Sequence, residues 1–331
     1  MQTARYEKLR KETLKNIFEK RKIASIWRDI VRSQLRTQDI RDLYDHYDLN
    51  FNIEDRAEAI RANILSGEYR PSRPLIFRIE KKFGICRHMV IPQPIDALVL
   101  QVLSEDVVET VIEQQPSENA FYSRARHNVP KPDEIGEYGL NLRQQWLKLQ
   151  KTIYRFSTEK NLIVTTDLSN YYDSIDMREL KKVFGRYIPQ KEVLLDMLFG
   201  IIEDISWRPD YLPYSDRGLP TSNLEGIRML AHSFLFEIDE VVKKMTGNCF
   251  ARWMDDIIIG ADSRKEATEI ISAVSDMLKS RGLALNMAKT DIYDQDAAFF
   301  NFQIEENKYL SSIKLIEKGK PGYANLTAEL K

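Results

Sequence analysis

Two adjacent aspartates, Asp255 and Asp256, lie in the run CFARWMDDIIIGADS, between two short apolar stretches. A carboxylate inside such an apolar strand pattern must be paired, protonated or bound to a cation. Arg252 is the only basic residue close to the pair in the sequence, and the next Lys or Arg is Arg264. Because a hard divalent cation such as Mg²⁺ prefers carboxylate oxygens, the pair predicts a metal site.

A third carboxylate, Asp167, is expected to join this pair. The apolar run 161–166 predicts a short buried strand that ends at Asp167, and 249–261 predicts a hairpin with the aspartate pair at its turn. From residue 161 the predicted order is strand, helix, helix, hairpin, helix and strand, which is a split βαβ sheet with helices on one face. In that arrangement Asp167 lies next to Asp255. Three carboxylates at one end of a sheet can hold two divalent ions that promote in-line phosphoryl displacement.

The rest of the sequence predicts mainly helices around this sheet. Apolar residues at positions 224, 227, 231, 234, 238, 241 and 245 share one face of a long predicted helix over 223–246, which Gly247 ends. Further helices are expected over 1–66, 95–115, 137–156, 176–187 and 264–281. Loops are expected over 116–136 and 205–220, a strand pair within 71–93, and strands at 283–286, 290–294 and 299–304.

Basic residues are concentrated in the first part of the chain. The formal net charge is −1, yet residues 1–36 contain eleven Lys/Arg against four Asp/Glu, and residues 61–90 contain seven against two. Such a region can bind a polyanion such as nucleic acid, or it can simply be a solvated helix face. Lys81, Lys82 and Arg87 lie on the predicted hairpin, where they could contact phosphate groups.

The chain shows none of the sequence signs of secretion or membrane insertion. Cys86 and Cys249 are the only cysteines, which are too few for a disulfide framework or a zinc site. The first residues, MQTARYEKLRK, lack the apolar centre of a signal peptide, and no apolar run is long enough to span a membrane. We expect a cytoplasmic protein with no membrane partner.

Segments within about 75–300 resemble the sequence motifs of reverse transcriptases, in the same order. DLSNYYDSI (167–175) resembles motif A, RGLPTS (217–222) motif B, WMDD (253–256) motif C and GLALNMAKT (282–290) motif D. KFGICR (82–87), Ile91, Pro92, Asp96, Gln101 and NAFYSR (119–124) are similar to the fingers blocks. Each motif alone is weak evidence, but the ordered set is specific.

The resemblance implies roles for individual residues. Asp167 and Asp255 match the metal-binding aspartates, Asp256 matches the second acid of motif C, and Leu168 would offer its backbone carbonyl to a metal ion. Lys289 matches a motif D lysine that can donate a proton to the leaving pyrophosphate. Tyr172 matches the aromatic side chain that clashes with a ribose 2′-hydroxyl, which implies dNTP as the substrate. The implied substrate-binding residues are Lys81, Lys82, Arg87, Tyr172, Pro220, Thr221 and Ser222.

The implied fold class is α+β, with the fingers and palm of a right-hand polymerase. We expect a helical N-terminal extension over 1–70, fingers over 71–160, and a palm over 161–305 that includes a finger-side insertion at 188–216. Residues 306–331 would start a thumb or form a tail, and they are too few for a full helical thumb. Either the chain is a fragment, or a partner subunit, a noncoding RNA or a second copy of the chain completes the primer-binding cleft.

Two motifs depart from the common reverse transcriptase pattern. Motif B commonly reads Pro-Gln-Gly, where this chain has Pro220, Thr221 and Ser222, and motif C commonly begins with Tyr or Phe, where this chain has Trp253. With these motifs and a helical N-terminal region, the chain is most similar to the bacterial abortive-infection and defence-associated (antiphage) reverse transcriptases. The departures concern template handling more than metal chemistry.

The predicted function is RNA-directed DNA synthesis, in which two Mg²⁺ or Mn²⁺ ions assist transfer of a dNTP to a primer hydroxyl on an RNA or DNA template-primer. Template-independent or protein-primed synthesis by the same site is an alternative. Another is a non-catalytic nucleic-acid-binding subunit, although Asp167, Asp255 and Lys289 would then have no evident use. A nucleotidyl cyclase shares a similar sheet, but WMDD does not match its Gly-Gly-Asp/Glu-Glu turn.

Overall fold

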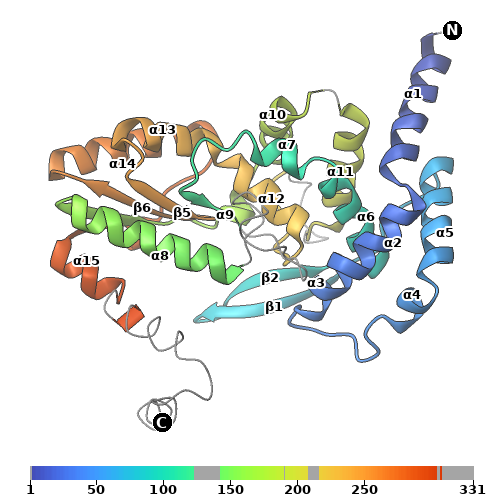
Figure 1. Ribbon diagram of the computed structural model, residues 1–331, viewed down its shortest axis with the longest axis horizontal. Helices are drawn as coiled ribbons and strands as arrows, with labels where there is room; N and C mark the ends of the chain where they lie inside the picture. Colours follow the sequence, from blue (N-terminus) through green and yellow to red (C-terminus); the bar gives the residue numbers. More distant parts are fainter. Residues whose placement is uncertain (1, 123–141, 190, 208–215, 304–305, 308–331) are drawn as a thin grey trace, which may run out of the picture.

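The computed structural model describes residues 2–122, 142–189, 191–207, 216–303 and 306–307. Its first part is helical, as the sequence predicts, and these helices lie at one end of the molecule (Figure 1). They are α1 (Gln2–Ile17), α2 (Lys20–Ile26), a π-helical stretch (Trp27–Val31), α3 (Arg32–Arg36), α4 (Tyr47–Phe51) and α5 (Ile53–Ser66). α5 ends at Gly67, whose φ of +79° is a conformation that glycine adopts without steric penalty.

A two-stranded hairpin follows, formed by β1 (Leu75–Lys82) and β2 (Ile85–Ile91), as predicted. Most of the hairpin is exposed, but Met89 and Val90 are buried at its base. There the Val90 amide donates a 2.9 Å hydrogen bond to the carbonyl of Thr221. The hairpin is therefore attached to the loop that precedes α12 (Glu225–Phe234). α6 (Pro94–Glu105) and α7 (Val108–Ile112) come next in the chain.

A five-stranded sheet forms the other end of the molecule, with strand order β3-β5-β6-β4-β7. β3 pairs in parallel with β5, and the other three pairs are antiparallel. The strands are β3 (Ala120–Phe121), β4 (Leu162–Thr166), β5 (Phe250–Trp253), β6 (Asp256–Ala261) and β7 (Asp291–Asp294). The predicted pairing of the 161–166 strand with the 249–261 hairpin is thus present, because β4 lies against β6.

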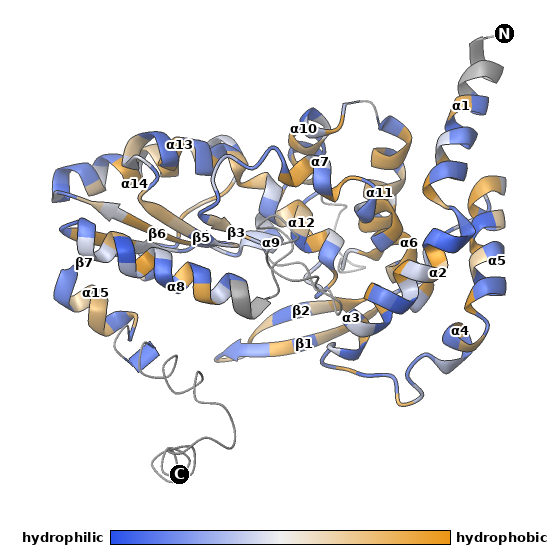
Figure 2. Cartoon of the chain, viewed as in Figure 1, coloured by the Kyte–Doolittle hydropathy of each residue, from blue (hydrophilic) through white to orange (hydrophobic). Residues whose placement is uncertain are grey.

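Helices cover both faces of this sheet, whereas the sequence predicted helices on one face. Val164 belongs to the main core with α13 (Phe236–Thr246) and α14 (Arg264–Ser280), while Ile163 belongs to a second core with α8 (Leu142–Glu159) and α15 (Gln295–Asn301). Figure 1 shows the two helix pairs on opposite sides of β5 and β6, and Figure 2 shows how hydrophobic these strands are. Successive apolar residues suit a strand that is buried on both faces. The predicted α+β class is confirmed.

In the described part of the chain, three helices lie between β4 and the loop before α12. They are α9 (Tyr171–Ser174), α10 (Met177–Tyr187) and α11 (Glu192–Ile205). Asp176 begins α10, as predicted: its carboxylate accepts hydrogen bonds from the amides of Arg178 and Glu179 at 2.9 and 3.1 Å. α11 is not predicted from the sequence pattern, and it lies within the expected insertion at 188–216. Its buried side chains join the main core.

The helix predicted over 223–246 is two helices, α12 and α13, which meet at Leu235. In an uninterrupted helix the His232 carbonyl would accept from the amide four residues later. Here it accepts from the Leu235 amide and from the Arg252 side chain, both at 3.3 Å. The buried face shifts after this break. Val242 and Thr246 are buried, in place of the residues predicted at 241 and 245.

Two strands predicted near the end of the chain are wrong. Within 283–286 only Leu285 forms a bridge, with Leu168, and the two backbone hydrogen bonds beside it join 284 and 286 to residues that follow β4. In the predicted strand 299–304, residues 299–301 belong instead to α15. Asp294 begins that helix by accepting a 2.9 Å hydrogen bond from the Ala297 amide. The start of the helix predicted over 137–156, most of the predicted tail, and positions 123–124 of the NAFYSR motif lie outside the described residues.

None of the described helices is long and apolar enough to cross a membrane.

The close packing of α12 on α6 allows a test of the fold. A Cβ atom at Gly226 would lie 2.1 Å from Ser104 Oγ and 3.1 Å from Ser104 Cβ. We therefore expect Gly226→Ala to lower the free energy of unfolding by roughly 1–3 kcal/mol in urea denaturation. Adding Ser104→Gly should restore part of the loss, because it removes the atoms in contact.

Gly200→Ala in α11 is the matched control, since nothing lies within 4 Å of its added Cβ. It should be neutral or slightly stabilising, because alanine favours a helix over glycine. A Gly226→Ala protein as stable as the parent would contradict the packing described.

Candidate active site

The acidic pair lies where the sequence predicts it, at the turn between β5 and β6. Trp253 and Asp256 form the last pair of the hairpin, so Met254 and Asp255 make a two-residue turn. Met254 has a φ of +55°, a conformation that costs a non-glycine residue roughly 1 kcal/mol. The tight turn places both carboxylates at the end of the sheet.

Asp167 meets this pair from the neighbouring strand. Thr166, the last residue of β4, lies opposite Ile257, so Asp167 continues the chain beside the start of β6. Asp167 is only 6% exposed, Asp255 is half-buried and Asp256 is exposed. Asp167 and Asp255 are close enough to share a hydrogen bond. The structure therefore brings together the three acids that the sequence singled out.

Burial and the neighbouring negative charges make ionisation of these carboxylates less favourable than it is in water. Burial, together with the charges of Asp256 and Asp167, raises the pKa of Asp255 to about 6. Although Asp256 is exposed as a residue, loss of water around its carboxylate and the Asp167 charge also raise its pKa, while Lys289 opposes that shift. Carboxyl pKa values raised by burial and by neighbouring negative charge are a frequent property of functional sites.

Lys289 supplies positive charge to this group. Its ammonium lies 2.7 Å from Asp167 Oδ2, and the hydrogen bond to Asp167 raises the pKa of Lys289. The lysine ends a short 3₁₀ helix (Met287–Lys289) that follows Asn286. Asn286 donates to the Asp167 carboxylate at 3.3 Å and, through its backbone amide, to the Asp167 carbonyl at 2.7 Å. The sequence resemblance identifies Lys289 but gives no sign of Asn286, an amide within the same segment.

Tyr172, on α9, lies close to the acids. Its side chain is half-buried, and its carbonyl accepts a 2.8 Å hydrogen bond from the Leu219 amide. Burial raises the pKa of Tyr172, and the charges of Arg228, Asp255 and Arg87 also shift this pKa. Two arginines, from the hairpin and from α12, therefore lie near the same tyrosine. Arg228 is not among the residues predicted from the sequence, although it is a basic residue within the apolar run of α12.

The other predicted substrate-binding residues lie at two places. Pro220, Thr221 and Ser222 form the loop that attaches the hairpin to α12, and the Ser222 hydroxyl accepts from the Leu224 amide at 3.5 Å. Lys81 and Lys82 are exposed near the hairpin turn, where the Lys82 ammonium lies 4.9 Å from the centre of the Phe83 ring. Across the described part of the chain, no contact joins either lysine to the acids.

The Leu168 side chain is buried, and its backbone pairs with Leu285. The donor atoms gathered here are carboxylate oxygens, which suit a hard divalent cation. Among the residues that the structure describes, no three His, Cys, Asp or Glu side chains are arranged as a ready metal site. The Lys289 ammonium instead lies on one of the two Asp167 carboxylate oxygens, so a cation that coordinates this oxygen would compete with Lys289 for it.

Residues 79–311 match the protein family described as "Reverse transcriptase (RNA-dependent DNA polymerase)". The chain belongs to this family. The matched range contains the hairpin from Ile79 onward, β4 with Asp167, and the turn with Asp255. A comparison with curated proteins finds no match to this reverse transcriptase.

Among solved structures, this reverse transcriptase is similar to fungal telomerases. Apo telomerase from Candida tropicalis, truncated from the C-terminal domain, has a TM-score of 0.48 and 12% identity over 67% of this chain and 50% of that one. Telomerase from Candida albicans, bound to a TWJ fragment of telomeric RNA, has the same TM-score and identity over 67% of this chain and 42% of its own. This chain therefore spans about half the length of these telomerases.

The crowded carboxylates predict a dependence of stability on pH. Because the folded protein raises the pKa of Asp255, it holds the proton more tightly than the unfolded chain does. The contribution of this group to the free energy of unfolding therefore falls as the pH rises from about 4 to about 6. In EDTA at pH 7.5, Asp255→Asn should stabilise the protein by on the order of 1 kcal/mol. Urea denaturation at pH 4.5 should show little of this gain.

Asp262→Asn is the charge-matched control, because Asp262 is paired with Lys160 at 2.7 Å rather than crowded by acids. This variant should show no gain at pH 7.5. An Asp255→Asn protein that is equally or less stable than the parent at pH 7.5 would exclude repulsion among the three acids.

Proposed function

We propose that the chain is a metal-dependent DNA polymerase that joins dNTPs to a primer hydroxyl on an RNA or DNA template. The meeting of Asp167 with Asp255 and Asp256 at one end of the sheet carries this proposal. Crowded carboxylates destabilise a fold, so a functional reason for them is needed. Membership in a family of RNA-dependent DNA polymerases supplies the reaction class.

We infer that Asp167, Asp255 and Asp256, with the Leu168 carbonyl, hold two Mg²⁺ or Mn²⁺ ions. The all-oxygen donor set fits such ions, and the raised pKa values of Asp255 and Asp256 fit a group whose repulsion a cation would relieve. When bound, two such ions activate the attacking hydroxyl and offset the charge that develops on the transferred phosphate.

The remaining residues of the site have roles around that phosphate. Lys289 is the proposed proton donor to the leaving pyrophosphate, because its ammonium lies at the acids and Asp167 keeps it protonated. Arg87 and Arg228, which both act on Tyr172, would bind the triphosphate. We assign Lys81 and Lys82 to nucleic-acid phosphates, and Pro220, Thr221 and Ser222 to the surface below the templating base.

The proposed division into parts follows the sequence prediction. Residues 1–70 would form an extension, 71–160 the fingers, 161–305 the palm with a finger-side insertion at 188–216, and 306–331 the start of a thumb or a tail. Size measurement of the purified protein before and after nuclease treatment tests whether a partner subunit, a noncoding RNA or a second copy of the chain accompanies it.

The polymerase proposal predicts that Asp255→Ala abolishes DNA synthesis. The purified parent should incorporate labelled dNTP with Mg²⁺ or Mn²⁺ on a primed RNA or DNA template, and the variant should fall to background. Asp262→Ala, which removes a carboxylate from the opposite end of β6, should retain activity. Normal incorporation by a folded Asp255→Ala protein would sink the proposal and favour a non-catalytic nucleic-acid-binding subunit.

The position of Tyr172 predicts selection against ribonucleotides. Tyr172→Ala should raise the ratio of rNTP to dNTP incorporation by about tenfold or more, because the ring no longer blocks a 2′-hydroxyl. Tyr172→Phe keeps the ring and should keep the selectivity of the parent. Competing incorporation of matched rNTP and dNTP measures both. An unchanged ratio in Tyr172→Ala would assign the ring to packing alone.

The same incorporation assay distinguishes the kinds of synthesis that this site could support. Product formed without added template indicates template-independent synthesis. Product that enters a gel only after protease digestion indicates priming on the protein itself. Product that requires an added primed template and runs freely indicates ordinary reverse transcription.

We propose bacterial antiphage defence as the setting of this activity. The motif departures at Thr221, Ser222 and Trp253, together with the helical N-terminal region, support this proposal. A bacterium that expresses the parent should form fewer phage plaques than one that expresses Asp255→Ala. Equal plaque counts across a phage panel would contradict the defence role without affecting the polymerase assay.

A further inference from the structure

Arg252 is a fully buried arginine in β5, three residues before Asp255. Its side chain is 0% exposed, which is costly for a guanidinium unless every charge and donor is compensated. The sequence suggests Arg252 as a neighbour for the acidic pair. In the structure it points instead into the main helical side of the sheet, where it meets Asp239 of α13.

All five N–H groups of this guanidinium have an acceptor. Nε and one terminal nitrogen donate to the two carboxylate oxygens of Asp239, at 2.6 and 2.5 Å. The terminal nitrogens also donate to the His232 carbonyl at 3.3 Å and to His232 Nδ1 at 3.4 Å. The fifth bond, at 2.9 Å, goes to the carbonyl of Met254. Only arginine among the side chains carries five donors in one plane.

The bond to Met254 connects this buried group to the active site. Met254 is the first residue of the two-residue turn and has the unfavourable φ of +55°. A charged donor on its carbonyl stabilises one orientation of the peptide that joins Met254 to Asp255. That peptide determines where Asp255 begins, and therefore where its carboxylate lies relative to Asp167.

The partners of Arg252 are themselves held in place. His232 Nε2 lies 2.8 Å from the Gln115 side-chain oxygen, and burial together with the Arg252 charge lowers the pKa of His232. A neutral ring that donates from Nε2 leaves Nδ1 free to accept from Arg252. The ring also stacks on Tyr122, with 5.0 Å between ring centres. The orientation of the His232 ring beside Arg252 is therefore fixed by its own contacts with Gln115 and Tyr122.

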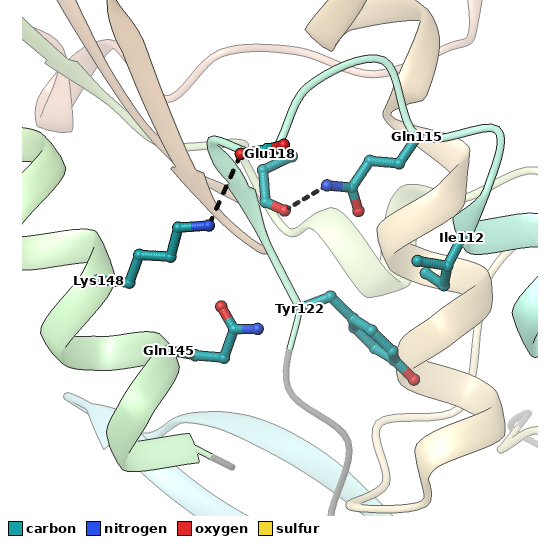
Figure 3. A pocket seen from close by; sticks show the side chains of 7 residues that line it. Ile112, Gln115, Glu118, Tyr122, Gln145 and Lys148 are labelled. Carbon is teal, nitrogen blue, oxygen red and sulfur yellow. Dashed lines mark hydrogen bonds and ion pairs between the residues drawn. The ribbon is translucent and has the colours of Figure 1, made fainter. Parts of the chain in front are cut away.

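Through Gln115 and Tyr122, this set of contacts extends to an open pocket (Figure 3). Gln115 and Tyr122 line this pocket, and the Gln115 amide donates to the carbonyls of Ser117 and Ala120 at 2.5 and 2.9 Å. Ala120 of β3 in turn pairs with Arg252 of β5. The same contacts thus hold the backbone around Arg252 as well as its side chain.

Alternative explanations for a buried ion pair are weaker here. An apolar pair of similar volume often stabilises a fold as well as a buried ion pair does. Arg252 also takes up the His232 carbonyl, at the point where α12 and α13 are interrupted. A buried guanidinium that costs desolvation, binds a carbonyl where two helices meet and also binds the turn before Asp255 indicates a role at the turn.

We propose that Arg252, held by Asp239 and His232, is a positioning residue that sets the conformation of the Met254–Asp255 turn and so the affinity of Asp255 and Asp256 for divalent cations. This inference rests on the metal site of the proposed function. It concerns binding of the cation, so it can be tested without any measurement of DNA synthesis.

The experiment is a titration of the purified protein with Mn²⁺ alone, in which electron paramagnetic resonance measures the free ion. Arg252→Lys keeps the positive charge but cannot reach Asp239, His232 and Met254 together. We expect its dissociation constant for Mn²⁺ to rise about 10- to 100-fold, the usual effect of losing a residue that orients metal ligands. Circular dichroism below the unfolding temperature establishes that the variant is folded.

Arg281→Lys is the matched control. Arg281 also binds two acids, Glu237 at 2.7 Å and Glu179 at 2.9 Å, but no contact recorded for the described chain joins it to the turn. This variant should lose some stability and keep the Mn²⁺ affinity of the parent. Asp239→Asn, which preserves the size of the side chain, is the second variant and should also weaken Mn²⁺ binding. It keeps the test available if Arg252→Lys does not fold.

Each outcome decides the matter. Unchanged Mn²⁺ affinity in either folded variant overturns the role of Arg252. A parent that binds Mn²⁺ no better than Asp255→Ala overturns both this inference and the metal site beneath it. A parent that binds Mn²⁺ through Asp255, yet incorporates no dNTP, contradicts the proposed function and leaves the test of Arg252 valid.

Discussion

The meeting of Asp167, Asp255 and Asp256 at one end of the sheet is the constraint on which the candidate site depends. The antiparallel pairing of β4 with β6 places the three carboxylates close together, because Thr166 and Ile257 are fixed opposite each other. A backbone hydrogen-bond ladder is strong enough to impose this, since its bonds act cooperatively along both strands. The surrounding residues then reduce the cost rather than remove it. Lys289 and Asn286 both bind Asp167, and both belong to the segment that leads into β7.

The features that the sequence predicts correctly depend on short-range patterns. The strand before Asp167 and the hairpin around Asp255 are apolar runs, and α10 begins at a side chain that bonds its own first turn. What the sequence does not predict depends on distant residues. At the interruption near Leu235, the His232 carbonyl accepts from a guanidinium that belongs to another element, β5, and the segment 283–286 meets the chain only at Leu168, past the end of β4. Local periodicity contains no information about either.

The same distinction applies to the candidate site. Acids in an apolar run are visible in one sequence because burial of charge is improbable without a reason. Arg228 and Asn286 are polar residues of ordinary appearance, and only the packing of α12 and of the motif D segment places them at Tyr172 and Asp167. Arg252 shows the reverse error. Its nearness in sequence suggests contact with the acids, but alternation along β5 directs its side chain to the opposite side from Trp253.

The hydrogen bond between Val90 and Thr221 has a mechanical consequence. The hairpin of β1 and β2 is attached to the rest of the molecule at its buried base, and this base is bonded to the backbone of the loop before α12. A hairpin that swings as a rigid lever must therefore either break this bond or pull the loop with it. In the proposed polymerase, movement of this hairpin and reshaping of the loop proposed to lie below the templating base would then be a single motion rather than two.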